Sequence, residues 1–150
     1  GFVKNPPTLY DSEYFFTERN EESEEMLYDQ ILVSNYINNN TGDGEKILVF
    51  YGSPSIYFLS ERESCTRWLF MHESRVSNDE DIQNEIINDL IKNKVRYVVF
   101  ADHSHSDLEN ITYKDGMMVI APIVYDFILQ NYSHEVTIGE TLQYEVFHIK

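Results

Sequence analysis

The chain has 150 residues, of which 42% are hydrophobic, so it is long and apolar enough to form one domain with a single core. Its 26 acidic and 11 basic side chains give a formal net charge of −15. Because such a surface repels phosphate backbones and anionic lipid headgroups, we expect no nucleic-acid partner.

The sequence also limits the covalent and membrane features that the chain can have. Its single cysteine, Cys65, allows no internal disulfide. No stretch approaches the run of about 18 apolar residues that a membrane span needs. Since the chain starts at Gly1 without methionine, we expect it to be a fragment of a longer protein.

Residues 1–19 are predicted to form an arm that packs on a single α/β domain made of residues 20–150. Pro6 and Pro7 exclude a helix in this arm, and its aromatic side chains are suited to hold it on the domain. These aromatic residues are Tyr10, Tyr14, Phe15 and Phe16.

The first half of the domain alternates helical and strand patterns. Apolar residues at helical spacing predict a helix over residues 20–37, and the continuous apolar run 47–51 predicts a strand buried on both faces. Ser53 and Pro54 then open a short helix, in which Ile56, Tyr57 and Leu59 are expected to face inward. Residues 66–71 are predicted to form a second strand.

The second half continues this alternation. A helix is predicted over residues 79–93, a strand over 95–101, a polar loop over 102–116 and a helix over 120–132. Residues 135–138 and 142–149 read as a hairpin that turns at Gly139 and Glu140. The apolar stripe of the helix over 79–93 is expected to contain Ile82, Ile86, Ile87, Leu90 and Ile91.

This order predicts a three-layer α/β fold. Strands that alternate with helices are typical of right-handed crossovers and a mostly parallel sheet flanked by helices, here with a C-terminal antiparallel hairpin.

A polar cluster directly after the strand over 95–101 is the first candidate site. Asp102, His103, His105 and Asp107 carry carboxylates and imidazoles that could bind a divalent metal. Open α/β sheets place their ligands at this end of a strand. The alternating spacing matches no recognised ligand pattern, so a solvated loop is the competing interpretation.

A second candidate lies around the cysteine. Arg62 and Arg67 could bind an anion together, or they could pair with the surplus carboxylates of the chain. Cys65 between them could act as a nucleophile, but a small buried packing residue is the alternative. The turn over residues 51–55 lacks a phosphate-binding glycine pattern, and we expect no cofactor.

Three groups of segments resemble one family in their order and spacing. The first group comprises residues 47–52, 55–62 and 66–67, the second residues 87–99, and the third residues 127–132, 138–139 and 144–147. Together they resemble the soluble C-terminal domain of multi-span membrane glycosyltransferases that use polyprenyl-phosphate sugars. This is the dolichyl-phosphate-mannose protein mannosyltransferase-like and aminoarabinose-transferase-like group.

The resemblance implies a non-catalytic extracytoplasmic domain, tethered by membrane spans upstream of Gly1, that shapes acceptor access or partner contacts. The catalytic acidic residues of that family lie in an early loop next to the membrane, so no catalytic residue carries over to this chain. The expected partners are the membrane-embedded portion of the parent chain and a glycan or protein acceptor. The chain departs from the family pattern at Glu61, where glycine is usual, and at Val95, where proline is usual.

Two other hypotheses compete with this interpretation. The first is a small flavodoxin-like module that binds a ligand or an ion without enzymatic activity. The second is a stand-alone hydrolase or transferase that uses Cys65, His103 or His105.

Overall fold

The computed structural model describes residues 20–50, 53–69, 79–102, 121–141 and 143–150. The predicted arm over residues 1–19 lies outside these described residues, and so does most of the polar loop over 102–116.

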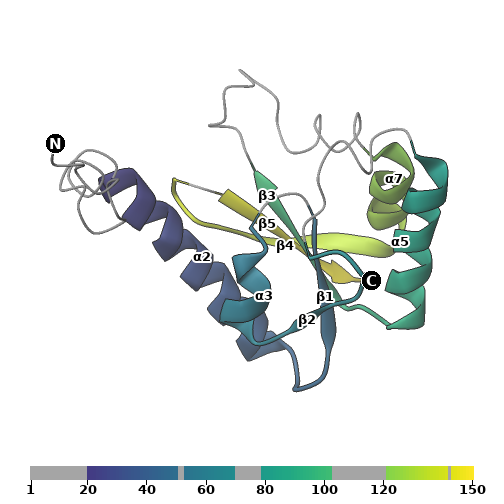
Figure 1. Cartoon of the computed structure of the whole chain (residues 1–150), viewed down its shortest axis with the longest axis horizontal. Helices are drawn as coiled ribbons and strands as arrows, with labels where there is room; N and C mark the ends of the chain where they lie inside the picture. Colours follow the sequence, from purple (N-terminus) through teal and green to yellow (C-terminus); the bar gives the residue numbers. More distant parts are fainter. Residues whose placement is uncertain (1–19, 51–52, 70–78, 103–120, 142) are drawn as a thin grey trace, which may run out of the picture.

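The described chain forms one mixed five-stranded sheet with helices in the connections (Figure 1). In chain order the elements are α2 (Asn20–Asn40), β1 (Lys46–Phe50), α3 (Ser55–Ser60), β2 (Glu63–Ser64), α5 (Glu80–Lys92), β3 (Tyr97–Asp102), α7 (Pro122–Asn131), β4 (Tyr132–Ile138) and β5 (Gln143–Ile149). The strand order is β2-β1-β3-β5-β4. β1 pairs in parallel with β2 and β3, whereas β5 is antiparallel to both β3 and β4. The predicted α/β class and C-terminal hairpin are confirmed.

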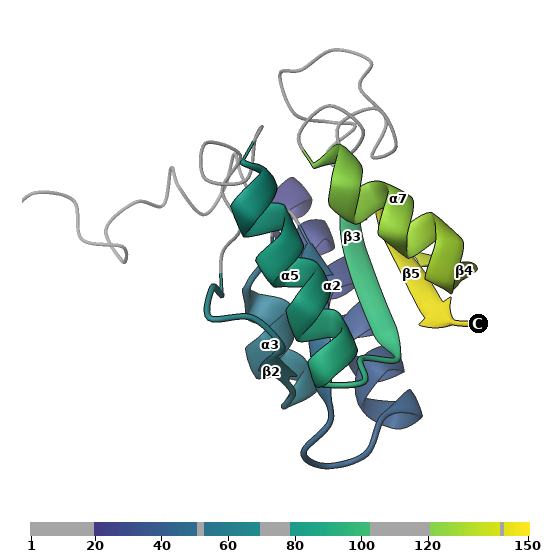
Figure 2. The same ribbon diagram turned by 90° about the vertical axis from the view of Figure 1, so that its right-hand side faces the viewer.

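The helices cover both faces of the sheet, as Figure 2 shows with α5 and α7 side by side in front of the strands and α2 and α3 behind. In β1, Leu48 and Phe50 belong to the hydrophobic cluster under α5 and α7. Ile47 and Val49 belong to the cluster under α2 and α3. β1 is apolar at every central position because successive side chains enter opposite cores.

The segment after α3 differs from the sequence prediction. The predicted strand over residues 66–71 is wrong, because the second strand is Glu63–Ser64 and residues 66–69 belong to no strand. The hydroxyls of Ser64 and Thr66 both donate to the carbonyl of Trp68, at 3.2 and 2.9 Å. Such local bonds offer the backbone a turn in place of a strand ladder. Residues 70 and 71 lie outside the described residues.

Two side chains predicted to face inward are exposed instead. Leu59 of α3 is exposed, and Ile91 of α5 is 59% exposed, so both predictions are wrong. In α5 the buried positions are Ile86, Leu90 and the polar Gln83. The apolar stripe of α5 is therefore narrower than the sequence pattern predicts. It is centred on the side of the helix that faces α7 and the sheet.

The long helix α2 is anchored to the distant hairpin through a buried carboxylate. Asp29 is 2% exposed, and its two oxygens accept hydrogen bonds from the backbone amides of Glu140 and Thr141, at 3.1 and 2.9 Å. A carboxylate that accepts two backbone N–H groups makes strong charge-assisted bonds. This contact fixes α2 against the β4–β5 turn.

An ion pair just before β1 makes the stability of the domain depend on pH. Arg96 donates from Nε and Nη2 to the two carboxylate oxygens of Glu45, at 2.6 and 2.7 Å. This hydrogen bonding holds the pKa of Glu45 at about 2, below its ordinary value of 4.5. A carboxyl with a depressed pKa contributes stability above its unfolded pKa and loses it as the pH falls toward the folded value.

We therefore expect Glu45→Gln to destabilise the domain at pH 7 by about 1 kcal/mol, because the pair is partly exposed and screened by solvent. The difference from the wild type should shrink as the pH falls from about 5 toward 2. Urea unfolding at several pH values measures it, with Glu63→Gln at an exposed position as the control. A pH-independent difference would contradict the assignment.

Candidate functional site

The junction between α3 and β2 is built by a left-handed turn. Glu61 follows the last residue of α3 with φ 56° and ψ 37°. Its amide donates to the carbonyl of Phe58 at 3.2 Å, and the amide of Arg62 donates to the carbonyl of Tyr57 at 3.1 Å. This pair of bonds is the Schellman ending of a helix, in which the left-handed position favours glycine. The turn directs Arg62 toward the C-terminus of α2.

Arg62 is buried, with 6% of its surface exposed, and its guanidinium caps α2. Nε donates to the hydroxyl of Thr41 at 2.8 Å, and Nη2 donates to the carbonyls of Thr41 and Asn38, at 2.9 and 3.4 Å. Nη1 donates to the carbonyl of Glu61 at 2.9 Å and lies 3.6 Å from a carboxylate oxygen of Asp43. A cation at a helix C-terminus is favourable because the last carbonyls carry partial negative charge.

Arg67 reaches a different helix. Its guanidinium forms an exposed bidentate pair with Glu85 of α5, with Nε at 2.9 Å from Oε1 and Nη2 at 3.2 Å from Oε2. It also lies 4.3 Å from the ring centre of Trp68. Arg62 thus bonds to α2 and Arg67 to α5, so their guanidinium groups are held by different helices, although both residues line one pocket. Anion binding by this pair stays a prediction.

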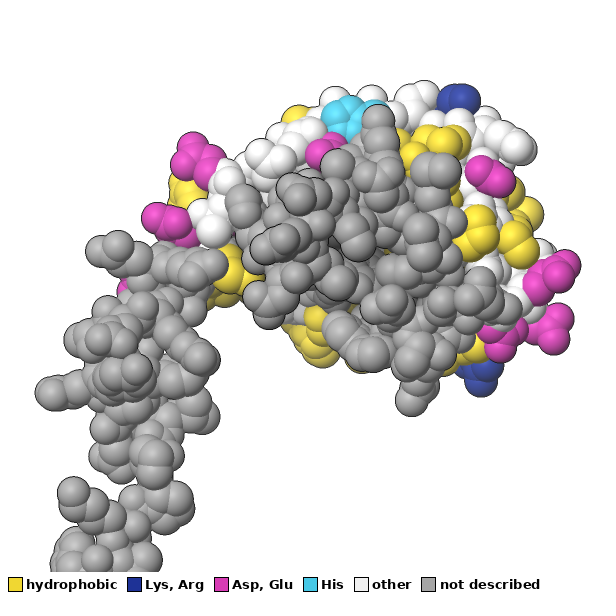
Figure 3. Space-filling view, turned by 90° about the horizontal axis from the view of Figure 1, so that it is seen from above, with side chains coloured by type: hydrophobic (Ala, Val, Ile, Leu, Met, Phe, Trp, Pro, Cys, Tyr) yellow, Lys and Arg dark blue, Asp and Glu magenta, His cyan; other side chains and the backbone are white. Residues whose placement is uncertain are grey.

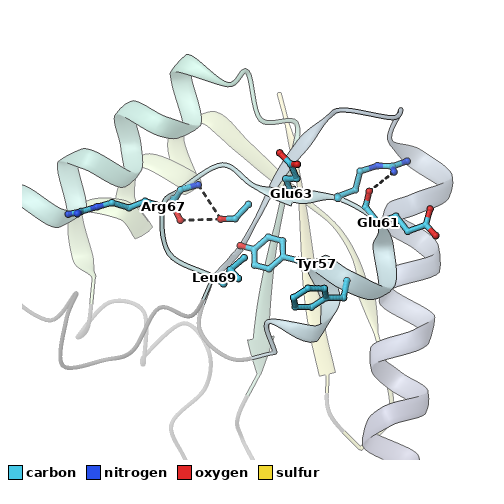
Figure 4. Close-up of a pocket in the computed structure, with 9 residues that line it drawn as sticks. Tyr57, Glu61, Glu63, Arg67 and Leu69 are labelled. Atoms are coloured by element: carbon cyan, nitrogen blue, oxygen red, sulfur yellow. Dashed lines mark hydrogen bonds between the residues drawn. The ribbon is translucent and has the colours of Figure 1, made fainter.

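A shallow pocket of about 480 Å³ opens over the same segment (Figure 4). Tyr57 is a buried lining residue, whereas Phe58 is 71% exposed and Leu69 is also exposed. Glu61 and Glu63 contribute exposed carboxylates to its lining. Figure 4 shows Leu69 beside the ring of Tyr57 and the carboxylates of Glu61 and Glu63 pointing in different directions. The pocket thus combines apolar contact area with separate acidic residues, and Arg62 and Arg67 also belong to its lining. This arrangement suits binding better than concerted catalysis.

Cys65 is a packing residue in this structure. It is 6% exposed and belongs to the cluster under α5 and α7. Burial, followed by the charge of Asp89, raises the pKa of the thiol to about 12. Because the thiolate is the nucleophile, a buried thiol with so high a pKa is poorly suited to catalysis.

The metal candidates are described only in part. Asp102 ends β3 and pairs with Gln143 of β5, while His103, His105 and Asp107 lie outside the described residues. Within the described ranges, no group of three or more His, Cys, Asp or Glu side chains is arranged to hold a metal ion. Metal binding by the loop, and the ion-binding module it would support, stay predictions.

The turn after β1 is described from Ser53 onward, since residues 51 and 52 lie outside the description. The Ser53 hydroxyl lies 2.8 Å from the hydroxyl of Tyr144, and Ser55 donates to the side-chain oxygen of Gln30 at 2.6 Å. These hydroxyls join the turn to β5 and α2.

Sequence reasoning missed a polar cluster on the hairpin. The β4–β5 register shifts between His134 and Val136, so Glu135 is a bulge residue. A bulge changes which face the following side chains occupy. His134 and Thr137, which would otherwise alternate, therefore both meet Glu145. Glu135 turns to the other face, where its carboxylate accepts from Tyr36 at 2.6 Å and raises the pKa of Tyr36 to about 12.

The geometry of this cluster differs from that of a nucleophilic triad. Glu145 is buried and accepts a hydrogen bond from the Thr137 hydroxyl at 2.6 Å. His134 meets both Glu145 and Thr137 through the same nitrogen, Nε2. In a triad the imidazole contacts the acid and the nucleophile through different nitrogens. The cluster therefore holds the bulge in place and does not activate the hydroxyl.

On the face drawn in Figure 3, the acidic side chains of the described residues do not gather in one patch. Figure 3 shows acidic side chains at several separate places along the rim of the visible described surface, with hydrophobic side chains beside them. None of the helices that the structure describes combines the length and apolar composition needed to span a bilayer.

Comparison with known proteins yields a weak structural match. No family model matches the sequence, and no curated protein matches it. A solved structure, the C-terminal globular domain of an oligosaccharyltransferase from Archaeoglobus fulgidus, is similar over 81% of this chain and 97% of its own. The sequences are 16% identical and the TM-score is 0.45, so the match carries no argument about function.

The different environments of the two arginines give a matched test. We expect Arg62→Met to destabilise the domain by roughly 2–3 kcal/mol, because it removes the charge-assisted bonds from a buried guanidinium to the end of α2. Arg67→Met should cost less than about 1 kcal/mol, as is usual for exposed ion pairs. Unfolding of both variants in guanidinium chloride measures the difference in their free energies of unfolding. Equal losses of stability would contradict the capping role of Arg62.

The left-handed conformation of Glu61 leads to a second prediction. Replacing Glu61 by glycine should stabilise the domain by about 0.5–1 kcal/mol, because the relief of backbone strain outweighs the greater freedom of glycine in the unfolded chain. Glu63→Gly in β2 is the control and should destabilise, since an extended residue gains nothing from glycine. Thermal unfolding measures the stability of the two variants. A loss of stability in Glu61→Gly would contradict the prediction.

Proposed function

We propose that this chain is the non-catalytic extracytoplasmic domain of a membrane glycosyltransferase that uses a lipid-linked sugar donor. In this proposal the domain shapes acceptor access or partner contacts, while the chemistry occurs in the membrane-embedded portion of the parent chain. The proposal rests on the ordered resemblance of three segment groups to the polyprenyl-phosphate-dependent group.

One geometric observation carries this proposal beyond the sequence pattern. The family pattern has glycine at the position of Glu61, and Glu61 has a left-handed φ of 56° in this chain. Only glycine adopts this conformation without steric cost. The backbone here therefore has the shape that the glycine of the family pattern would favour, which supports a common local structure despite the substitution.

The second departure from the family pattern has a local consequence. The amide of Val95 donates to the carbonyl of Leu90 at 3.1 Å, and Lys94 before it has φ 50°. These features form the Schellman ending of α5. Proline lacks an N–H and cannot make this bond. A chain with proline here would end the helix differently, so this departure concerns the helix end and leaves β3 intact.

The described candidates for chemistry support a non-catalytic role. The Cys65 thiol is buried, the Arg62 donors are directed at the chain itself, and His134 stabilises a bulge. Catalytic groups must converge on a reacting atom, and these three lie in separate environments.

We assign acceptor contact to the α3–β2 pocket. It is lined by the segment that carries the first part of the resemblance, and the exposed Phe58 shares this lining with Glu61 and Glu63. An aromatic face provides contact area for the apolar side of a sugar or a peptide side chain, and carboxylates accept hydrogen bonds from hydroxyl or amide groups. A glycan or protein acceptor fits this chemistry.

The test uses the full-length gene product in membranes, with a radiolabelled polyprenyl-phosphate sugar as donor. We expect Phe58→Ala to raise the KM for the acceptor about three- to tenfold, corresponding to about 1 kcal/mol of lost contact, with the donor KM unchanged. Ile91→Ala is the matched control, because Ile91 is equally apolar and 59% exposed on α5.

The outcomes separate the two parts of the proposal. Failure of the wild-type protein to transfer sugar from polyprenyl-phosphate donors would overturn the glycosyltransferase assignment. Sugar transfer with an unchanged acceptor KM in Phe58→Ala would overturn only the role of the pocket. An equal rise in Ile91→Ala would assign the effect to general destabilisation.

A further inference from the structure

The middle turns of α2 are apolar on both sides of the helix. Val33 and Ile37 are fully buried against the sheet. On the opposite side, four large hydrophobic side chains are exposed and lie next to one another at helical spacing, forming a surface that we call the outer patch. The outer patch consists of Leu27, Tyr28, Ile31 and Leu32, of which Tyr28 is 61% exposed.

An apolar surface of this kind is unusual for a helix at a protein surface. A surface helix normally has one apolar stripe and a polar opposite face, whereas a helix that is apolar all round is covered on both sides. Exposed polar residues frame the outer patch, with Glu24 and Glu25 before it and Asn35 and Asn39 after it. Figure 1 shows the amino-terminal turns of α2 projecting past the sheet. The exposed fractions of the four side chains show that the described elements leave the patch uncovered.

We propose that the outer patch binds the aromatic segment over residues 10–16 of the same chain. This segment precedes α2 directly and contains Tyr10, Tyr14, Phe15 and Phe16. The described side chains that form the two cores of the sheet are already almost completely buried. The aromatic rings therefore need a surface outside those cores, and the outer patch is apolar and adjacent in the chain.

The chain length fits this arrangement. At a rise of 1.5 Å per residue, the outer patch spans about 10 to 18 Å from the start of α2. An extended chain covers about 3.3 Å per residue, so Phe16 and Tyr14 can reach about 13 and 20 Å back along the helix. A segment that reverses at Asn20 thus brings Tyr14, Phe15 and Phe16 to the patch.

Other occupants fit less well. Four side chains are far fewer than the 20 to 30 residues per side, about 800 Å² per partner, of a stable interface, so a second copy would bind weakly. A tethered segment has a millimolar effective concentration and can occupy a small patch. The carboxylates of Glu24 and Glu25 beside the patch would repel an anionic lipid surface.

Thiol labelling tests the proposal in the 150-residue chain. Ile31→Cys places a thiol in the outer patch, and Asn39→Cys places one on the same helix outside it. The native Cys65 is buried and gives little background. When the segment covers the patch, we expect the thiol introduced at position 31 to react with a water-soluble maleimide at least about tenfold more slowly than the thiol introduced at position 39.

The decisive comparison replaces the rings without shortening the tether. Introducing Tyr14→Ser, Phe15→Ser and Phe16→Ser together should speed labelling at position 31 by about tenfold and leave position 39 unchanged, with the circular dichroism spectrum unaltered. Labelling at position 31 that is fast in both backgrounds would overturn the proposal. Protection that persists in the serine variant, or that increases with protein concentration, would also overturn it and assign the patch to another occupant.

Discussion

The capping of α2 by the buried guanidinium of Arg62 is the contact on which the architecture depends most. It joins three elements at one point, because Arg62 lies at the end of the α3 turn, at the start of β2 and against the last carbonyls of α2. Asp29 fixes the same helix to the β4–β5 turn through two backbone amides. α2 is thereby held over the sheet at two separated places, which closes the core formed by Val33, Ile37 and their neighbours.

Hydrophobic patterns predicted the larger elements because burial determines them. The continuous runs of β1 and β3 require helices on both faces, and the alternation of β5 fits a strand beside them. β2 has two residues and therefore no period to detect. Gln83 could not be predicted as buried, since its burial depends on the amide of Ile123, 40 positions away, to which its side-chain oxygen is bonded at 2.9 Å.

The candidate site shows why neighbours in sequence can separate in space. Arg62 and Arg67 are five residues apart, but the bends after β2 direct them to different helices. Conversely, His134, Thr137 and Glu145 converge only because of the bulge at Glu135, and no sequence period signals a bulge. The segment around the Glu61 turn could be matched to a family pattern from its sequence. The partners of its side chains could not be predicted, because they depend on tertiary contacts.

The two edges of the sheet have a further consequence for how copies of this domain behave when crowded together. At one edge, β2 is only two residues long, and at the other, β4 is bent by the bulge and carries exposed His134 and Glu135. Short, bulged or charged edges resist pairing with a strand from another molecule. The edges of the described sheet are therefore protected against pairing into intermolecular sheets, even when copies of the domain are concentrated.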